Sequence, residues 1–504
     1  MGAAMDDHRT SAPVKEEPRR SALSPESLDL AIIAAFSLVG GFAVAGSAAT
    51  FGDGDTSWHI AAGEWMIAHR SIQLVDPFSF PMLGQRWIAH EWLSELVMGG
   101  LYRIGGFAAV GMLTVASVVA TLAIIGLWIR RWANSAELAI SLALILFSLV
   151  TFVLARPMVL AWPVLALWMV VLLRARENGD MPPPWWTLLV MVLWVNLHAS
   201  WILGMLIAAA VGLEAMIASP TRRVVTGWIA YGIALSAVTL LNPNFIAAWV
   251  VPLQAFTDQN IIVVQEFSPT DVGYTPMFEL SLFAALAVGW WRGARIAPMR
   301  IIIVLAMLHL ALAHMRHQAL FLIVGGLVLV PPLTKRWIAK LPPRPGLASS
   351  MKLGPHGAVV LGLGGVLAFL AVAAARMSTP FEPLESPVNP LHGFAAIPPS
   401  LRSQPVLNNY SLGGPLILRG IRPFIDGRYD LYGSEFAKDY VRISEGDETA
   451  FQNADRRWNF GWTMLSPRQT ALLKILDNRR DWRRHYADRF TVIHVKVQPP
   501  PAKK

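Results

Sequence analysis

Apolar segments recur along this chain and alternate with short polar ones, which limits the possible folds more than any other feature. The first apolar segment, 28–50, is long enough to cross a bilayer as a helix. Further apolar segments follow at 107–129, 136–155, 157–173, 183–197, 200–218, 224–241, 277–291, 300–315, 318–334 and 356–376. The chain is 54% hydrophobic and 15% charged, far more apolar than an ordinary soluble domain. We therefore expect an α-helical polytopic membrane protein with about eleven transmembrane helices.

The basic residues gather in every second loop between these segments. They are Arg130, Arg131, Arg174, Arg176, Arg222, Arg223, Arg292, Arg295, Arg300, Lys335, Arg336, Lys340, Arg344 and Lys352. Cytoplasmic loops carry an excess of Lys and Arg. This pattern predicts that residues 1–28 form a disordered cytoplasmic tail and that the intervening loops face outward. The net charge of +9 then reflects membrane topology, and we expect no nucleic-acid partner.

The end of the chain differs in composition from the membrane domain predicted for residues 29–376. Residues 377–504 are polar, and they include a strand pattern, VIHVKV, and a helical pattern, RQTALLKILDNRRDW. We expect a C-terminal extracytoplasmic α/β or α+β domain there, of ordinary domain size. The chain has no cysteine, which excludes disulfides and thiolate metal sites.

The first outward loop, 51–105, carries the densest set of reactive side chains. Both of its halves have an aromatic side and a charged side, which is typical of helices lying on a membrane surface. Asp53 and Asp55 are the candidate catalytic carboxylates, and Asp55 is the preferred general base because it lies nearest the aromatic helix. The alternative is that these residues only cap the helix that begins near Thr56.

Further candidates for substrate binding lie in the same loop. His59 follows Asp55 by one helical turn, so the two side chains can share a face. A carboxylate and an imidazole can bind a divalent metal, but two ligands are too few to predict one. We therefore assign no metal ligands and leave the cofactor open. His90 and Glu91 form either a second acid/base pair or the polar side of a surface helix.

Other candidates lie on later outward loops. Arg156, Arg316 and His317 lie where predicted spans emerge, and cations there suit a phosphate or pyrophosphate group. The alternative is that they reach toward lipid head groups. His198 and Glu266 complete the substrate-binding set, although a structural role explains each of them better than catalysis does when it is taken alone.

In the C-terminal domain the segment FIDGRYDLYG contains Asp426, Arg428 and Asp430. Oppositely charged side chains this close in sequence predict an ion network internal to the domain rather than a catalytic group.

Several motifs together resemble the GT-C-fold glycosyltransferases. They are DGDTSWHIAAGEWMI, DPFSF, HEWLSE, NPNF, EFSP and FIDGRYDLYG, and they are most similar to a group of bacterial membrane proteins of that type. The resemblance implies a polytopic enzyme of the bacterial inner membrane that takes a sugar from a polyprenyl-phosphate carrier on the periplasmic side. It also implies that an Asp of the first outer loop, here Asp53 or Asp55, is the base or a metal ligand. The chain departs from many members in having Asp-Gly-Asp instead of adjacent Asp-Glu, and it lacks the WWDYG signature of oligosaccharyltransferases.

The sequence hypothesis is therefore a membrane glycosyltransferase whose partners are the bilayer, a polyprenyl-phosphate-linked sugar and an acceptor that is a glycan, a lipid or a protein. Asp55, with Asp53, would activate the acceptor hydroxyl, and Arg156, Arg316 and His317 would offset charge on the leaving phosphate. Three alternatives stay open: a polysaccharide polymerase or ligase that uses a lipid carrier, a transporter, and a non-enzymatic envelope scaffold. A transporter would favour inverted repeats, which are not evident here.

Overall fold

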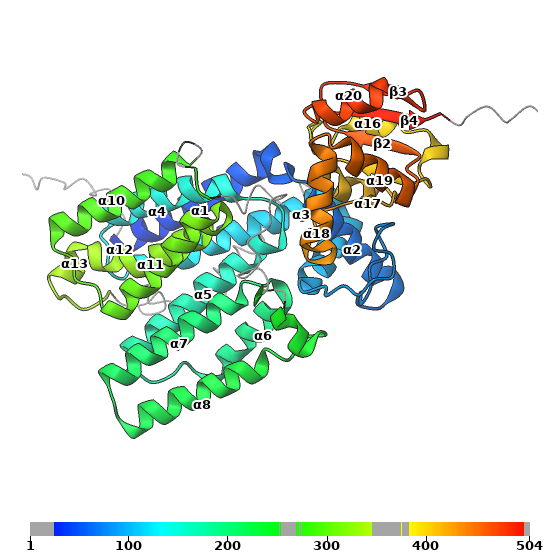
Figure 1. The fold of residues 1–504 in the computed structure, drawn as a ribbon. Coiled ribbons are helices and arrows are strands. Elements are labelled where there is room, and N and C mark those ends of the chain that lie inside the picture. Colours follow the sequence, from blue (N-terminus) through cyan, green and yellow to red (C-terminus); the bar gives the residue numbers. More distant parts are fainter. Residues whose placement is uncertain are drawn as a thin grey trace, which may run out of the picture.

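The computed structural model describes residues 25–250, 252–253, 269–271, 273, 275–344, 374 and 383–497. Within these residues a bundle of helices lies beside a smaller domain that contains the sheet (Figure 1). The bundle helices are α1 (Pro25–Gly46), α3 (Trp92–Ile129), α4 (Ser135–Leu149), α5 (Pro157–Glu177), α6 (Leu188–Leu197), α7 (Trp201–Ala218), α8 (Arg222–Val238), α10 (Pro276–Arg292), α11 (Pro298–Ala313), α12 (Gln318–Leu333) and the short α13 (Lys335–Ile338).

Six helical segments of the described chain are long and apolar enough to cross a membrane. They are Glu26–Gly46, Trp92–Ile129, Ser135–Phe152, Pro157–Glu177, Trp201–Ala218 and Met315–Leu333, and each contains or overlaps an expected span. The expected spans near 183–197, 224–241, 277–291 and 300–315 correspond to the shorter helices α6, α8, α10 and α11, and 356–376 lies outside the described residues. The protein is thus a helical membrane protein, whereas the expected number of about eleven spans is not confirmed.

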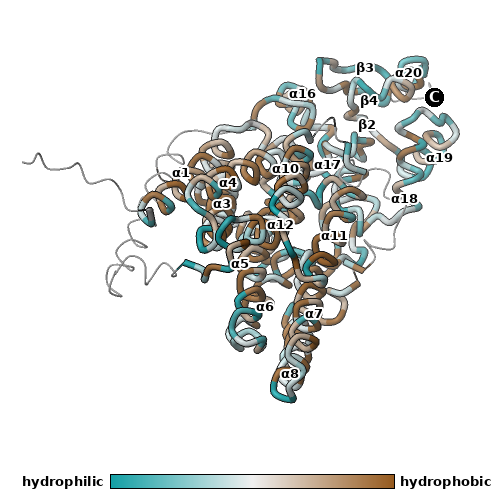
Figure 2. Tube along the Cα trace, turned by 90° about the vertical axis from the view of Figure 1, so that its left-hand side faces the viewer, coloured by the Kyte–Doolittle hydropathy of each residue, from teal (hydrophilic) through white to brown (hydrophobic). Residues whose placement is uncertain are grey.

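The surface of the bundle is apolar where it would meet lipid. Leu189, Ile217 and Ile233 are 67–70% exposed, and hydrophobic residues dominate the bundle helices in Figure 2. Trp290 and Trp291 are 92% and 81% exposed at the end of α10. Tryptophan at helix ends is typical of the boundary between hydrocarbon and water.

The basic ends of the helices are joined by ion pairs at one end of the bundle. These pairs are Arg131–Glu177, Arg292–Glu137, Arg176–Glu214, Arg300–Glu214 and Arg344–Asp29, with N–O distances of 2.6–3.4 Å. We call the arginines of these ion pairs the basic set. Because α1 ends and α3 begins at the opposite end of the bundle, the first loop lies far from the basic set. Which end faces the cytoplasm remains a prediction from the charge pattern.

Helix α3 is divided by two glycines. Gly105 and Gly106 leave helical geometry, and Gly106 has a φ of 59° that only glycine adopts easily. The helix contains 38 residues, whereas a bilayer needs about 20. The part before the break, 92–104, therefore lies outside the predicted span 107–129, which the part after the break contains.

The C-terminal domain is a small mixed α/β unit. Its sheet has the order β1-β2-β4-β3, with β1 (Val406–Asn408) parallel to β2 (Trp462–Leu465), whereas β3 (Trp482–Ala487) and β4 (Val492–Lys496) are antiparallel to their neighbours. Its helices are α16 (Leu391–Ala395), α17 (Gly413–Leu418), α18 (Tyr429–Ser444), α19 (Glu448–Trp458) and α20 (Thr470–Asn478). The predicted strand at VIHVKV and the predicted helix in RQTALLKILDNRRDW are confirmed as β4 and α20.

Helix α2 (Asp55–His69) lies between α3 and α17, and therefore between the bundle and the C-terminal domain. Its residues from Thr56 to Gly63 are all buried. The expectation of a helix lying on a membrane surface is wrong for α2. Its aromatic side faces protein instead, because Trp58 packs against Trp87 and Ile417.

A buried arginine joins the first loop to the C-terminal domain. Arg428 donates to Asp426 through Nε (2.8 Å) and Nη2 (2.7 Å), and to Asp76 of the first loop through Nη1 (2.6 Å). The side chains of all three residues are 0% exposed, and the Tyr432 hydroxyl also donates to Asp426. The predicted ion network exists, but it is not internal to the domain, and Asp430 forms no ion pair with it among the described residues.

We expect Arg428→Ala to destabilise the protein strongly, because it leaves two buried carboxylates without their cation. Breaking a buried pair in this way costs about 3–5 kcal/mol. Thermal unfolding of the purified protein in detergent measures the effect. Arg442→Ala is the control, because Arg442 lies on α18, the helix that Arg428 precedes, but its side chain is 56% exposed. Such surface pairs contribute about 0–1 kcal/mol. Equal stability of the two variants would contradict the role of Arg428.

Candidate functional site

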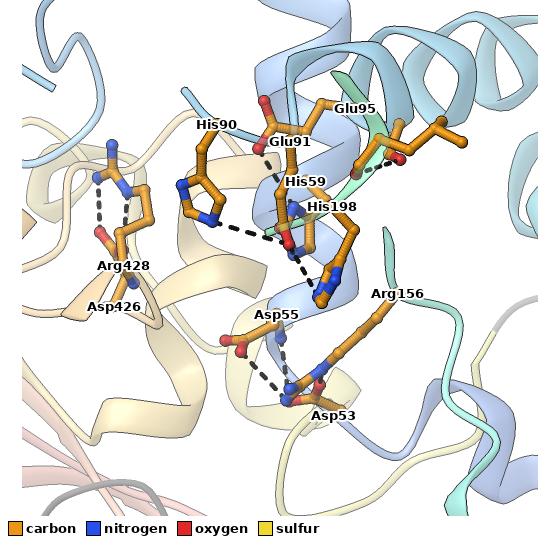
Figure 3. A network of polar contacts seen from close by, with 12 residues as sticks. Asp53, Asp55, His59, His90, Glu91, Glu95, Arg156, His198, Asp426 and Arg428 are labelled. Carbon is orange, nitrogen blue, oxygen red and sulfur yellow. Dashed lines mark hydrogen bonds and ion pairs between the residues drawn. The ribbon is translucent and has the colours of Figure 1, made fainter. Parts of the chain in front are cut away.

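The candidate site lies at the end of the bundle opposite the basic set, where several chain segments meet the C-terminal domain. Asp53, Asp55 and His59 come from the start of α2, and His90 and Glu91 come immediately before α3 (Figure 3). Arg156 is the N-cap residue of α5, and His198 lies in the turn between α6 and α7. Arg316 and His317 belong to the 3-10 turn Met315–His317. The last candidate, Glu266, lies outside the described residues.

Asp53, Asp55 and Arg156 form one charged group. The Arg156 Nε pairs with Asp53 Oδ2, and its Nη2 lies 3.1 Å from Asp55 Oδ2. Asp53 also accepts the backbone N–H of Asp55, the first residue of α2, at 3.1 Å, whereas the N-cap residue is Gly54 and the helix has no side-chain cap hydrogen bond. All three side chains are 15–19% exposed. The predicted base and the predicted phosphate-binding cation are thus in contact with each other.

Glycines allow this group to pack closely against the C-terminal domain. A Cβ at Gly54 would lie 2.0 Å from the Ser411 carbonyl oxygen, and one at Gly414 would lie 2.1 Å from the Gly54 oxygen. A Cβ at Gly427 would lie 1.8 Å from Asp55 Oδ1. The glycine between the two aspartates is therefore required by close packing of the backbones. This packing gives a physical reason for Asp-Gly-Asp at this position.

A second group, which we call the His/Glu cluster, contains His59, His90, Glu91, Glu95 and His198. The His59 Nδ1 lies 3.3 Å from Glu95 Oε1, and its Nε2 lies 3.8 Å from Glu91 Oε2. Glu91 Oε1 lies 3.2 Å from His198 Nε2 and 3.8 Å from His90 Nε2. His59 therefore contacts these glutamates, whereas Asp55, one helical turn before it, contacts Arg156.

Two hydrogen bonds hold His198 close to the other members of the His/Glu cluster. The indole of Trp92 donates to Asn196 Oδ1 at 2.8 Å, and the Ser94 hydroxyl donates to the Leu197 carbonyl at 2.8 Å. These bonds hold the start of α3 against the end of α6. The turn that follows α6 then carries His198 to Glu91.

The tautomer of His198 follows from its neighbours. Its Nδ1 accepts the backbone N–H of Ser200 at 3.0 Å, so in a neutral ring the proton is on Nε2. Burial and then the positive charge of Arg316 lower the pKa of His198 well below its usual value. In the neutral ring, the protonated Nε2 therefore lies 3.2 Å from Glu91 Oε1. Arg316 and His317 both influence this ring electrostatically, which places them close to the cluster.

Burial sets the other protonation states. It lowers the pKa of His59 to about 4, although the Glu91 carboxylate opposes the shift. Burial also raises the pKa of Glu91, against the effect of the neighbouring histidines. For His90, burial lowers the pKa, but the carboxylates of Glu91, Asp430 and Glu95 together raise it above the usual value. The cluster therefore combines a neutral His59 with a histidine that protonates easily.

A close helix crossing brings His59 and Glu95 together. Gly63 lies one turn after His59, and Gly99 lies one turn after Glu95. A Cβ at Gly63 would lie 1.9 Å from the Glu95 carbonyl oxygen, and one at Gly99 would lie 2.5 Å from the Glu64 nitrogen. Only glycine at these positions allows α2 and α3 to approach closely enough for the two side chains to meet.

Sequence reasoning missed three residues of this region. Glu95 follows Glu91 by four residues, a spacing that places both carboxylates on one face of a helix, and HEWLSE already contained that signal. Asp76 and the contribution of Asp430 had no such signal, because their role depends on contacts between the first loop and the C-terminal domain. With Glu91 and Glu95 added to His59, the described residues offer a three-residue group that could hold a metal ion. The sequence-based site assignment named no metal ligands, so this group is an addition to it.

Chemically, the two groups provide acids, bases and cations within one region. The charged group offers carboxylates near Arg156, and the His/Glu cluster offers a buried set of nitrogen and oxygen ligands. No protein-family model matches the chain, and a search of curated proteins returned no match.

We expect Gly63→Ala to destabilise the protein and to separate His59 from Glu95. Forcing a methyl group into such a close contact costs roughly 1–3 kcal/mol. Thermal unfolding in detergent measures the change. Gly100→Ala is the matched control, because a Cβ there would lie 3.8 Å from Ile67 Cδ1, an ordinary contact. An unfolding midpoint of Gly63→Ala equal to that of Gly100→Ala would argue against the tight crossing.

Proposed function

We propose that this protein is a membrane glycosyltransferase that transfers a sugar from a polyprenyl-phosphate carrier to an acceptor outside the cytoplasm. The observation that carries the proposal is the group formed by Asp53, Asp55 and Arg156. Carboxylates and a guanidinium lie together at the outer end of predicted spans. A lipid-linked donor would bring its phosphate to this depth while its tail stays among the helices. The resemblance of the motifs to GT-C enzymes supports the same reaction.

In the proposed reaction the acceptor hydroxyl attacks the anomeric carbon of the sugar. The new C–O bond forms as the bond between that carbon and the carrier phosphate breaks, so the configuration inverts. Asp55 accepts the proton of the hydroxyl, and polyprenyl phosphate leaves with the bonding electron pair. The Asp55 side chain suits this role because it is 19% exposed and therefore within reach of an acceptor.

Arg156 would stabilise the leaving phosphate. A guanidinium presents five N–H donors, so Arg156 can contact Asp53 and Asp55 and still reach a phosphate oxygen. Arg316 would add positive charge from the neighbouring turn. Cations held in place before the reaction stabilise developing charge without reorganisation, which is a large catalytic effect.

The C-terminal domain would form one wall of the acceptor site. Gly427 lies against Asp55, and the charge of Asp430 acts on His90 and His59. An acceptor approaching Asp55 therefore has to pass this domain. A lipid-carrier polymerase or ligase would also use outer cationic groups, and the identity of the acceptor separates it from a transferase of single sugars.

We expect Asp55→Asn to lower the transfer rate by about 10²–10⁴, the usual contribution of a general base. The assay incubates purified protein in lipid nanodiscs with polyprenyl-phosphate sugars extracted from its host, and it follows release of polyprenyl phosphate. Asp439→Asn is the control, because its side chain is 72% exposed on α18. The double variant Asp53→Asn/Asp55→Asn should be inactive while keeping the wild-type unfolding midpoint within a few degrees. Wild-type turnover by that double variant would rule out the mechanism.

A further inference from the structure

We propose that His59, Glu91 and Glu95 form a binding site for a divalent transition-metal ion of the Zn²⁺ or Mn²⁺ type. The site is separate from Asp53 and Asp55, and its existence does not depend on the proposed sugar transfer.

The first argument is geometric. One ligand atom from each residue can be chosen so that all three lie within 4.8 Å of one another. The His59–Glu95 and His59–Glu91 separations are 3.3 and 3.8 Å. Ligands about 2.0–2.1 Å from a tetrahedral ion are roughly 3.3 Å apart. Binding therefore needs only small side-chain adjustments.

The second argument concerns the two ring nitrogens of His59. They face two different carboxyl groups, Nδ1 toward Glu95 Oε1 and Nε2 toward Glu91 Oε2. An imidazole nitrogen and a carboxylate oxygen are both usual ligands of transition metals. A cation between one of these nitrogens and the facing oxygen would therefore gain two ligand bonds.

The third argument is an unsatisfied oxygen. Glu95 has a side chain that is 1% exposed, yet its Oε2 has no hydrogen-bond partner in the described part of the chain. A buried carboxylate oxygen without a partner is costly. A cation bound by Glu95 through one or both oxygens would remove that cost.

The surroundings resemble the outer shell of a metal site. The His198 Nε2 lies 3.2 Å from Glu91 Oε1, whereas Glu91 Oε2 faces His59. The ring of Trp58 lies 3.5 Å from the ring of His59 and restricts its rotation. Hydrogen bonds to ligand carboxylates and restricted ligand rings are usual around bound metals.

The ligand set indicates the class of ion. One imidazole with two carboxylates suits Zn²⁺, Mn²⁺ or Fe²⁺, whereas Mg²⁺ and Ca²⁺ prefer oxygen ligands alone. The side chains of Glu91, His59 and Glu95 are 11%, 5% and 1% exposed, so protein would enclose the ion. Three protein ligands leave the fourth position of a tetrahedral ion for a water molecule.

The test measures metal content and binding directly. Full-length protein in detergent is stripped with a chelator, titrated with Zn²⁺, Mn²⁺ or Co²⁺, and desalted before elemental analysis. We expect about one ion per wild-type chain, a higher unfolding midpoint with metal, and cobalt absorption bands that indicate nitrogen and oxygen ligands. Glu95→Gln should weaken binding at least about 10-fold, and His59→Gln should remove the nitrogen contribution to the cobalt spectrum. His69→Gln, an exposed histidine on the same helix α2, should bind like wild type.

Two outcomes would overturn the proposal. One is a wild-type chain that retains none of the three ions and gains no thermal stability from them. The other is equal retention by wild type and Glu95→Gln, which would mean adventitious binding only. If Glu95→Gln fails to fold, His198→Ala replaces it, because loss of the His198 contact with Glu91 should weaken binding about 10–100-fold. These measurements use no substrate, so absence of metal binding would not contradict the proposed sugar transfer. Conversely, a protein that binds metal but transfers no sugar would not contradict the metal site.

Discussion

The site depends on one buried ionic interaction, the contact of Arg428 with Asp426 and Asp76. It joins the C-terminal domain to the first loop, 51–105. Each of these charges would be very unfavourable alone in a buried setting. The network therefore favours the arrangement in which domain and loop are together, and this arrangement positions Gly427 against Asp55 and Asp430 near His90.

Close backbone packing then determines the positions of the reactive side chains. Gly54 and Gly414 bring the start of α2 against the C-terminal domain, and Gly63 and Gly99 bring α2 against α3. Both contacts exclude side chains and therefore leave little freedom for the groups beside them. Asp55 and His59 lie one helical turn apart on α2, yet they enter different groups because each faces a different neighbour.

Part of this arrangement could be predicted from the sequence. Hydrophobic segments identified the bundle, and the segments VIHVKV and RQTALLKILDNRRDW identified β4 and α20. The count of spans was less certain because α6 and α11 are short. The candidate residues other than Glu266, which is not described, do lie in one region of the structure. Their ion-pair partners, however, could not be predicted. Pairing of Arg156 with Asp53, and of Arg428 with Asp76, joins residues more than a hundred positions apart, and no local pattern encodes such contacts. The burial of α2 was missed for the same reason, because the domain that covers it lies at the other end of the chain.

The central claim, that the site transfers a sugar from a lipid carrier, is tested most directly in cells of the source organism. Lipid-linked sugars and envelope glycans are compared by mass spectrometry between a deletion strain and the same strain carrying the wild-type gene. The account predicts that the deletion accumulates one polyprenyl-phosphate sugar and loses that sugar from the envelope, and that the wild-type gene reverses both changes. Unchanged carrier pools and an unchanged envelope in the deletion strain would contradict it.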